Sequence, residues 1–173
     1  MKKEGETHRE MRESAISVLE RVKRPGQRVV TSHSDRSEQR LFFGEPSRRT
    51  HMSDADILLI DDRTGKVDAI VEIKDRDVRP KNIVGIIGCT SICDKHVDRD
   101  GREYATSGVL LFIVVPDQTL GKNGSSKRAQ LEGIVERMAE NTRPLRKCVV
   151  CSAAEFAATC EESLASETPG SKN

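Results

Sequence analysis

The chain has 173 residues, of which 29 are lysine or arginine and 28 are aspartate or glutamate, giving a formal net charge of +1. This length suits one compact domain with a sizeable core, and the balanced charge excludes a globally basic nucleic-acid-binding or membrane-binding protein. The first thirty residues do not resemble a signal peptide, and no apolar run approaches the ~20 residues that cross a bilayer. We therefore expect an intracellular, cytoplasmic protein without a membrane partner, whose five cysteines are reduced thiols.

The first half of the chain contains a predicted helix, a predicted strand and a long polar region. Apolar residues recur every three or four positions over residues 7–24, which predicts an amphipathic helix, and the β-branched run 28–32 predicts a strand. The polar region 33–53 is interrupted by RLFFG and is expected to form a long functional loop or an added strand. The apolar segment 83–97 is predicted to be a buried helix, although its isoleucines and two glycines also permit a strand.

The second half alternates predicted strands and helices. Val109–Val115 is apolar without alternation, which is typical of a central strand covered on both faces. A loop (116–126), a helix with one apolar face, the strand KCVVC (147–151) and a last helix follow. Ser152 and Glu155 have the spacing of a capping box at the start of that helix. The order predicts an α/β fold with a mixed sheet, as a single domain over 1–165 with a disordered tail, 166–173.

The segment 54–76, DADILLIDDRTGKVDAIVEIKDR, is predicted to be a β-hairpin that carries charges at an otherwise apolar end. In DRTG, Asp at the first position and Gly at the fourth favour a type I turn with a three-residue loop, 63–65, and a glycine bulge. Asp62 then lies opposite Lys66, and Asp56 lies opposite Glu72. A register shifted by two residues would place Asp54 there instead.

Two opposed carboxylates suggest a binding site for a cation. Opposed residues on one sheet face have Cβ atoms about 5 Å apart, so Asp56 and Glu72 would repel each other without a compensating charge. Because strand side chains alternate, Lys74 shares this face while Val71 and Ile73 point into the core. Mg²⁺ held by oxygen ligands could activate water for phosphodiester hydrolysis, and Lys74 could position or deprotonate that water.

Asp56, the hairpin and the tripeptide EIK at Glu72–Lys74 resemble the PD-(D/E)XK nuclease superfamily, which includes type II restriction enzymes and archaeal Holliday-junction resolvases. The resemblance implies a restriction-endonuclease-like αβββαβ core with a mixed central sheet flanked by helices, here followed by a C-terminal αβα extension. It also implies that Asp56, Glu72 and the backbone carbonyl of Ile73 bind Mg²⁺ or Mn²⁺, and that Lys74 is catalytic. Ala55 replaces the proline of the motif, and the Q-x-x-x-Y of RecB-like exonucleases does not follow the lysine.

Members of this superfamily often add a glutamate from the first helix. The candidates here are Glu10, Glu13 and Glu20, of which Glu10 lies nearest the border of the apolar face. His8 is expected to be a packed or helix-end residue rather than a ligand. Ser32, after the first strand, would suit a resolvase-like protein.

A nearly neutral protein that binds DNA must concentrate its basic residues locally. Arginines of the polar region and two basic residues after the EIK motif are candidates for phosphate contacts, with an ordinary solvated surface as the alternative: Arg36, Arg40, Arg48, Arg49, Arg79 and Lys81. The chain has no Trp and one Tyr, so platforms for base stacking are scarce. Duplex or branched DNA is therefore favoured over single strands.

These observations predict a Mg²⁺-dependent DNA endonuclease, and a homodimer because cutting both strands requires two active sites. One alternative is a non-catalytic DNA-binding or assembly subunit that retains the fold, and another is an unrelated α/β binding protein. Cys148 and Cys151 have the spacing of metal ligands, but in a strand they face opposite sides. They are expected to be buried hydrophobic residues.

Overall fold

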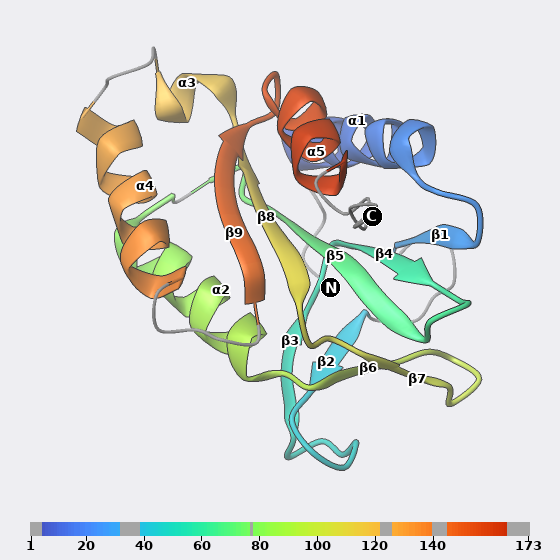
Figure 1. Ribbon diagram of the computed structural model, residues 1–173. Coiled ribbons are helices and arrows are strands. Elements are labelled where there is room, and N and C mark those ends of the chain that lie inside the picture. Colours follow the sequence, from blue (N-terminus) through green and yellow to red (C-terminus); the bar gives the residue numbers. More distant parts are fainter. Residues whose placement is uncertain (1–4, 32–38, 77, 122–125, 140–144, 166–173) are drawn as a thin grey trace, which may run out of the picture.

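Five strands form the body of a mixed β-sheet. The computed structural model describes residues 5–31, 39–76, 78–121, 126–139 and 145–165. Strands β1 (Gln27–Thr31), β4 (Ile57–Asp61) and β5 (Lys66–Ile73) are antiparallel neighbours, and β8 (Val109–Val115) and β9 (Leu145–Ser152) continue the sheet parallel to β5 (Figure 1). The predicted α/β fold with a mixed sheet is confirmed.

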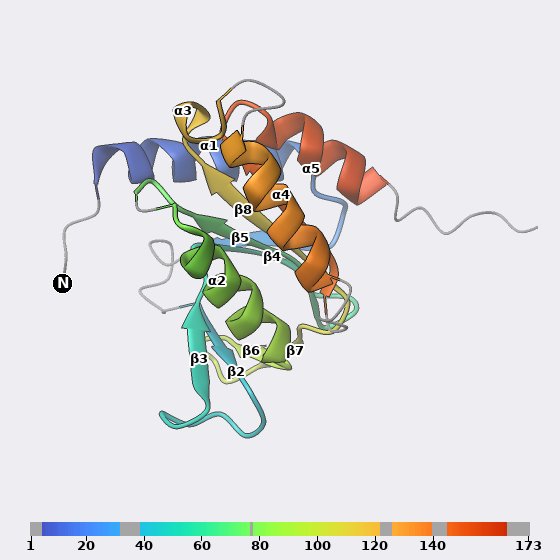
Figure 2. The ribbon, with the colours of Figure 1, turned by 90° about the vertical axis from the view of Figure 1, so that its left-hand side faces the viewer.

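Helices cover both faces of this sheet. Figure 2 shows α1 (Glu6–Val22) and α5 (Phe156–Ala165) on one side, and α2 (Pro80–Ile92) and α4 (Ser126–Ala139) on the other. The short helix α3 (Asp117–Leu120) lies within the segment expected to be a loop. None of the helices in the described ranges is both long and apolar enough to cross a membrane.

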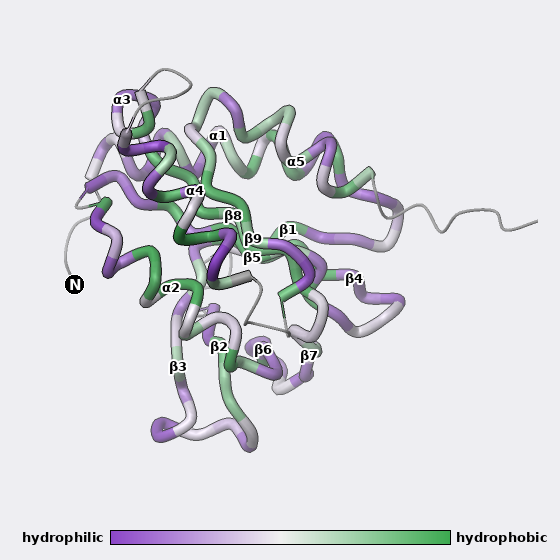
Figure 3. Tube along the Cα trace, turned by 60° about the vertical axis from the view of Figure 1, so that its left-hand side comes forward, coloured by the Kyte–Doolittle hydropathy of each residue, from purple (hydrophilic) through white to green (hydrophobic). Residues whose placement is uncertain are grey.

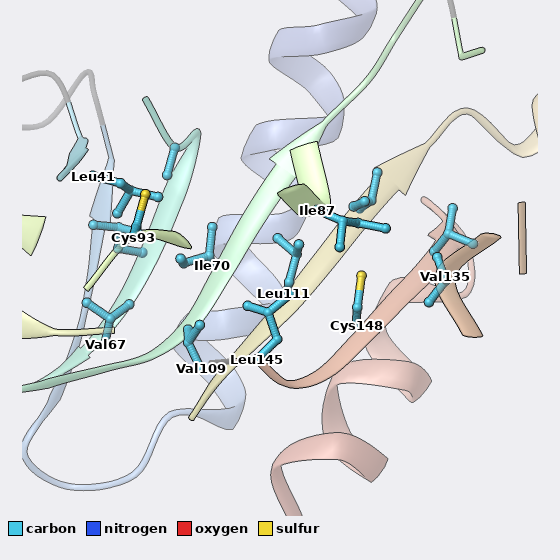
Figure 4. Packing of buried hydrophobic residues seen from close by; sticks show 14 of the residues in the cluster. Leu41, Val67, Ile70, Ile87, Cys93, Val109, Leu111, Val135, Leu145 and Cys148 are labelled. Atoms are coloured by element: carbon cyan, nitrogen blue, oxygen red, sulfur yellow. The ribbon is translucent and has the colours of Figure 1, made fainter. Parts of the chain in front are cut away.

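The hydrophobic core has two halves, one on each side of the sheet. Figure 3 shows hydrophobic residues concentrated along β5, β8 and β9. Alternate residues of β8 contribute to the two halves: Leu111 packs on the α2 and α4 side (Figure 4), and Phe112 packs on the α1 and α5 side, edge to face with Phe156. The prediction that β8 is covered on both faces is therefore confirmed.

The cysteines are reduced and largely inaccessible. Cys148 and Cys151 belong to opposite halves of the core, as their positions in one strand predicted. All five thiols are free, and burial raises the pKa of Cys148 and Cys151 to about 12, so these two are poor metal ligands.

Four short strands form two hairpins beside the main sheet. The first hairpin is β2 (Arg40–Phe42) with β3 (His51–Asp54), within the polar region, and the second is β6 (Lys95–Val97) with β7 (Glu103–Ala105). Strand β2 pairs with β6, and β7 joins the main sheet through the pair Lys66–Ala105. The β2–β3 hairpin projects from the body of the molecule (Figures 1 and 2).

The boundaries of one predicted helix are wrong. The helix expected over 83–97 spans Pro80–Ile92, because Pro80 suits the first helical turn, and Lys95–Val97 pairs with β2 and β7 instead of continuing the helix. The predicted first strand is Gln27–Thr31, and Ser32, the last residue of its predicted range, lies outside the described residues.

At the last helix, the Ser152 N–H donates to Glu155 Oε2 (3.0 Å), so the carboxylate half of the capping box is present.

The turn between β4 and β5 is one residue longer than predicted. Asp61, rather than Asp62, pairs with Lys66, and the Gly65 N–H donates to the Asp61 carbonyl (2.9 Å). Gly65 has the expected left-handed conformation, with φ of +67°. The Asp61 carboxylate stabilises the longer turn because it accepts a hydrogen bond from the Arg63 N–H (2.8 Å).

A bulge in β5 compensates for the longer turn. Asp68 is the extra residue between the pairs Ile60–Val67 and Leu59–Ala69, and its carboxylate binds the side-chain amide of Gln27. Beyond the bulge, Leu59 pairs with Ala69 and Ile57 pairs with Val71, as the sequence predicted. The register at the charged end of the hairpin is therefore the expected one.

Candidate active site

The structure brings Asp56, Glu72 and Lys74 together at the charged end of the β4–β5 hairpin. Asp56 immediately precedes β4, and the pair Ile57–Val71 places it across from Glu72. Asp56 Oδ2 accepts a hydrogen bond from the Ile73 N–H (2.7 Å), which fixes the carboxylate against β5. Lys74 follows β5, and its Nζ lies 3.7 Å from Glu72 Oε2.

These groups lie on the side of the sheet that α2 covers. Val71 and Ile73 pack in the core half formed with α1 and α5, whereas Ile70 packs in the half formed with α2 and α4. Because side chains alternate along β5, Glu72 points to the α2 side. The backbone of Lys74 is held in place by its N–H, which donates to the Val114 carbonyl (2.9 Å).

Glu72 is in an environment that disfavours its negative charge. The residue is only 4% exposed, and its Oε1 has no hydrogen-bond partner among the described residues. Burial, and secondly the charge of Asp56, raise the pKa of Glu72 to about 8, although the nearby Lys74 acts in the opposite direction. The surroundings therefore favour the protonated form of this carboxyl group until additional positive charge reaches it.

Helix α1 adds a residue that the sequence did not assign to the site. His8 Nε2 lies 3.5 Å from Asp56 Oδ1, and both side chains are largely buried. Gly5, directly before the helix, lies close to the segment that follows β5, because a Cβ built on Gly5 would be 3.1 Å from Asp75 Oδ2. His8 precedes Met11 by three residues, which is about one helical turn. This spacing was the signal in the sequence that His8 lies on the inward face of α1.

The three glutamates of α1 considered as ligands lie on the exposed side of the helix. Glu10 is exposed. It follows His8 by two residues, so the two side chains point in directions about 200° apart around the helix axis. Glu13 and Glu20 are also exposed. Glu13 lies near Arg9 of the same helix, and Glu20 lies near Lys23, the residue that follows the helix. Glu10 therefore lies on the outward side of α1, whereas the packing of the helix turns His8 inward.

Asp54 is not placed across from Glu72. Asp54 is the last residue of β3 and is exposed, and its Oδ1 lies 2.7 Å from His51 Nε2. The hairpin register that would have favoured Asp54 over Asp56 is not the one observed.

The donor atoms at the site suit a hard divalent cation. No three His, Cys, Asp or Glu side chains within the described ranges are grouped so that they alone could hold a metal ion. Asp56 and Glu72 supply two carboxyl groups, and Glu72 Oε1 is a buried oxygen with no hydrogen-bond partner in the described part of the chain. With the Ile73 carbonyl as a third oxygen, these residues match the ligand chemistry of Mg²⁺, which keeps several water ligands.

The basic candidates lie on two surfaces, one on the β2–β3 hairpin and one at the start of α2. Arg48 and Arg49 are exposed at the end of the projecting β2–β3 hairpin, and Arg40 is exposed on β2. Arg79 and Lys81 are exposed where α2 begins. Arg36 lies outside the described residues.

The end of the β2–β3 hairpin has its own hydrogen bonds. Thr50 Oγ1 donates to the Glu45 carbonyl (2.6 Å) and accepts from the Ser47 N–H (2.9 Å), and the Arg49 N–H donates to Ser47 Oγ (3.2 Å). Strand β3 runs from this end to Asp54, two residues before Asp56. The exposed arginines are thus connected to the candidate site by one short strand.

A second polar cluster lies at the opposite end of the β4–β5 hairpin. The Tyr104 hydroxyl is 2.9 Å from Arg28 Nη2 and 3.2 Å from both Asp62 Oδ1 and Asp98 Oδ2, beside a pocket of about 650 Å³. The guanidinium groups of Arg28 and Arg102 also lie 5.3 and 5.1 Å from the Tyr104 ring centre. These groups satisfy one another, which is typical of a structural cluster.

A search of protein-family models finds no match for this chain, and no curated protein matches it. Its own residues and their geometry therefore carry the functional inference.

Proposed function

We propose that this chain is a Mg²⁺- or Mn²⁺-dependent DNA endonuclease of the PD-(D/E)XK superfamily. The observation that carries the proposal is Glu72: a buried carboxyl group across from Asp56, with one oxygen 3.7 Å from Lys74 Nζ and the other without a hydrogen-bond partner among the residues that the structure describes. A buried carboxyl group across from a second, partly exposed carboxylate is destabilising by itself, so this arrangement beside a lysine is better explained by a bound cation than by stability.

The order of the elements supports the finer assignment of the fold. Elements α1, β1, β4, β5, α2 and β8 follow one another in the order αβββαβ, with the two short hairpins inserted. Elements α4, β9 and α5 would then be the αβα extension. We assign the core to the restriction-endonuclease-like fold on this basis.

Each residue of the site has a definable task. Asp56 and Glu72, with the Ile73 carbonyl, would hold the cation, and the Ile73 N–H keeps Asp56 oriented through its 2.7 Å hydrogen bond. When bound, Mg²⁺ supplies a Lewis acid that polarises the scissile phosphate and makes water more acidic. Lys74 positions the water and stabilises negative charge on the phosphate, while His8, whose Nε2 lies 3.5 Å from Asp56 Oδ1, helps to orient that carboxylate.

Duplex DNA is the proposed substrate. The arginines of the β2–β3 hairpin and those near the start of α2 would contact phosphates on either side of the scissile bond. Because Arg48 and Arg49 stand on an ordered, projecting hairpin, they can follow the backbone of a double helix without a large loss of conformational entropy.

The test is cleavage of supercoiled, linear and four-way-junction DNA with Mg²⁺, with Mn²⁺ and with a chelator. Metal-dependent nicking is expected, and Asp56→Asn should abolish it, whereas the matched control Asp54→Asn should retain it. Binding of these DNAs without cleavage under all metal conditions would instead identify a non-catalytic DNA-binding subunit. Loss of cleavage in Asp54→Asn with retention in Asp56→Asn would contradict the assignment of the site.

A further inference from the structure

Helix α2 is apolar on two sides, and the described part of the chain covers only one of them. Ile83 and Ile87 are buried against the sheet. On the outward side, Val84 is 42% exposed and Ile92 is 48% exposed. With Phe43, which is 58% exposed, these are the large hydrophobic residues that lie exposed in the described ranges.

The exposed residues of α2 form one continuous surface. Val84, Gly88 and Ile92 follow at four-residue intervals, so they lie one above another on the helix, and Gly85 borders them. We call these four residues the outer face of α2. Figure 2 shows α2 at the front of the molecule beside α4 and β3, and neither element passes in front of it.

The two glycines of the outer face have no role in the packing of the described chain. A Cβ built on Gly85 or Gly88 would meet no atom within 4 Å. Glycine is unfavourable inside a helix compared with alanine, because its backbone loses more conformational freedom on folding. A close approach by the backbone of a helix from another molecule would explain both glycines.

We propose that the outer face of α2 binds the same face of a second copy of this chain, with the two helices antiparallel. A two-fold axis at Gly88 would place Val84 against the partner's Ile92, so that the apolar residues cover each other. The glycines at the centre would allow the helix axes to come close together.

The charges at the two ends of the helix favour this orientation. Lys81 lies at the start of α2, and Asp94 lies two residues beyond its end, and both are exposed. In the antiparallel arrangement Lys81 lies near the partner's Asp94, whereas parallel helices would place Lys81 beside the partner's Lys81. The helix dipoles also oppose the parallel arrangement.

Phe43 extends the apolar surface next to the end of α2. The Asp94 N–H donates to the Phe42 carbonyl and the Gly44 N–H donates to Asp94 Oδ2, both at 2.9 Å, so Phe43 is held beside Asp94. A helix of 13 residues is about 20 Å long. Two such helices with flanking residues bury less than the about 800 Å² per partner of a standard interface, so we expect a dimer that dissociates at micromolar concentration.

The dimer would have a consequence for DNA cleavage that rests on the proposed function. Helix α2 begins six residues after Lys74, so the two candidate active sites would lie on either side of the two-fold axis. A duplex with its own two-fold axis could then be cut on both strands. Lys81 would contact the partner chain rather than a DNA phosphate.

The first experiment measures association by sedimentation velocity from 1 to about 200 µM protein, without DNA or metal. The wild-type chain should shift from monomer to dimer, and Gly88→Leu should remain monomeric at every concentration. Gly88→Leu should also melt at the same or a higher temperature, since leucine favours a helix and a Cβ at this position meets no atom within 4 Å. Gly133→Leu in α4, where a Cβ also meets no atom, is the matched control and should dimerise normally.

The second experiment tests the orientation with exchanged charges. Lys81→Glu and Asp94→Lys should each weaken the dimer at least about tenfold, and the double variant should restore it. Thermal melting checks that loss of the Asp94 hydrogen bond to Gly44 leaves the fold intact. A wild-type monomer at the highest concentration, normal dimerisation of Gly88→Leu, or no rescue in the double variant would overturn the proposal, whether or not the protein cleaves DNA.

Discussion

Replacing Glu72 by glutamine should change how the stability of the protein depends on pH. The carboxyl group is buried and its pKa is raised to about 8, first by burial and then by Asp56, compared with an ordinary value of 4.5 in the unfolded chain. Between these two pH values the folded state binds more protons than the unfolded state. The free energy of unfolding of the wild-type protein therefore decreases as the pH rises through this window, and Glu72 adds no further dependence above it.

The size of the effect follows from the displacement of the Glu72 pKa. A change from 4.5 to about 8 corresponds to at most about 5 kcal/mol, lost at no more than about 1.4 kcal/mol per pH unit. Glutamine at this position cannot ionise, so the variant lacks this loss. The difference in stability between Glu72→Gln and the wild type should thus increase by several kcal/mol from pH 5 to pH 8.5.

Urea unfolding followed by circular dichroism is the appropriate assay, because the chain has no Trp and one Tyr. A chelator should be present, since a bound cation would stabilise the ionised carboxylate and reduce the dependence on pH. Glu136→Gln, at an exposed position of α4, is the matched control and should differ from the wild type by a constant amount. A constant difference for Glu72→Gln as well would refute the described environment of Glu72.

Three further variants test other parts of the structure. Lys74→Ala should lower single-turnover DNA cleavage by about 10³-fold or more with less than about a threefold change in DNA affinity, while Lys66→Ala, at the far end of β5, should cleave normally; equal losses of affinity and cleavage would argue against a catalytic lysine. Arg48→Ala combined with Arg49→Ala should reduce the slope of log affinity against log salt by about 2, because two phosphate contacts disappear, and an unchanged slope would remove the β2–β3 hairpin from the interface. Tyr104→Phe should cost about 1–3 kcal/mol in urea unfolding, because the buried hydroxyl bonds Arg28 and two carboxylates, and a change below about 0.5 kcal/mol would show that this cluster does not stabilise the fold.

The sequence by itself determined which side of a strand each residue faces. Period-two alternation predicted that Val71 and Ile73 point away from Glu72, and the uninterrupted apolar run predicted that β8 is buried on both sides. The register at the charged end of the hairpin was also predictable, although the turn was not. An extra turn residue would have moved every side chain to the opposite face, so the bulge at Asp68 was needed to keep the apolar residues in the core.

Only the tertiary structure decided the features that depend on distant parts of the chain. Strand β2 is three residues long and pairs with β6, more than fifty residues later, which no local pattern reveals. His8 faces inward and Glu10 faces outward because of the way α1 is rotated when Leu19 and the rest of its inward face pack on the sheet. The raised pKa of Glu72 likewise arises from burial by several elements at once, so it follows from the packed fold and not from the tripeptide that contains it.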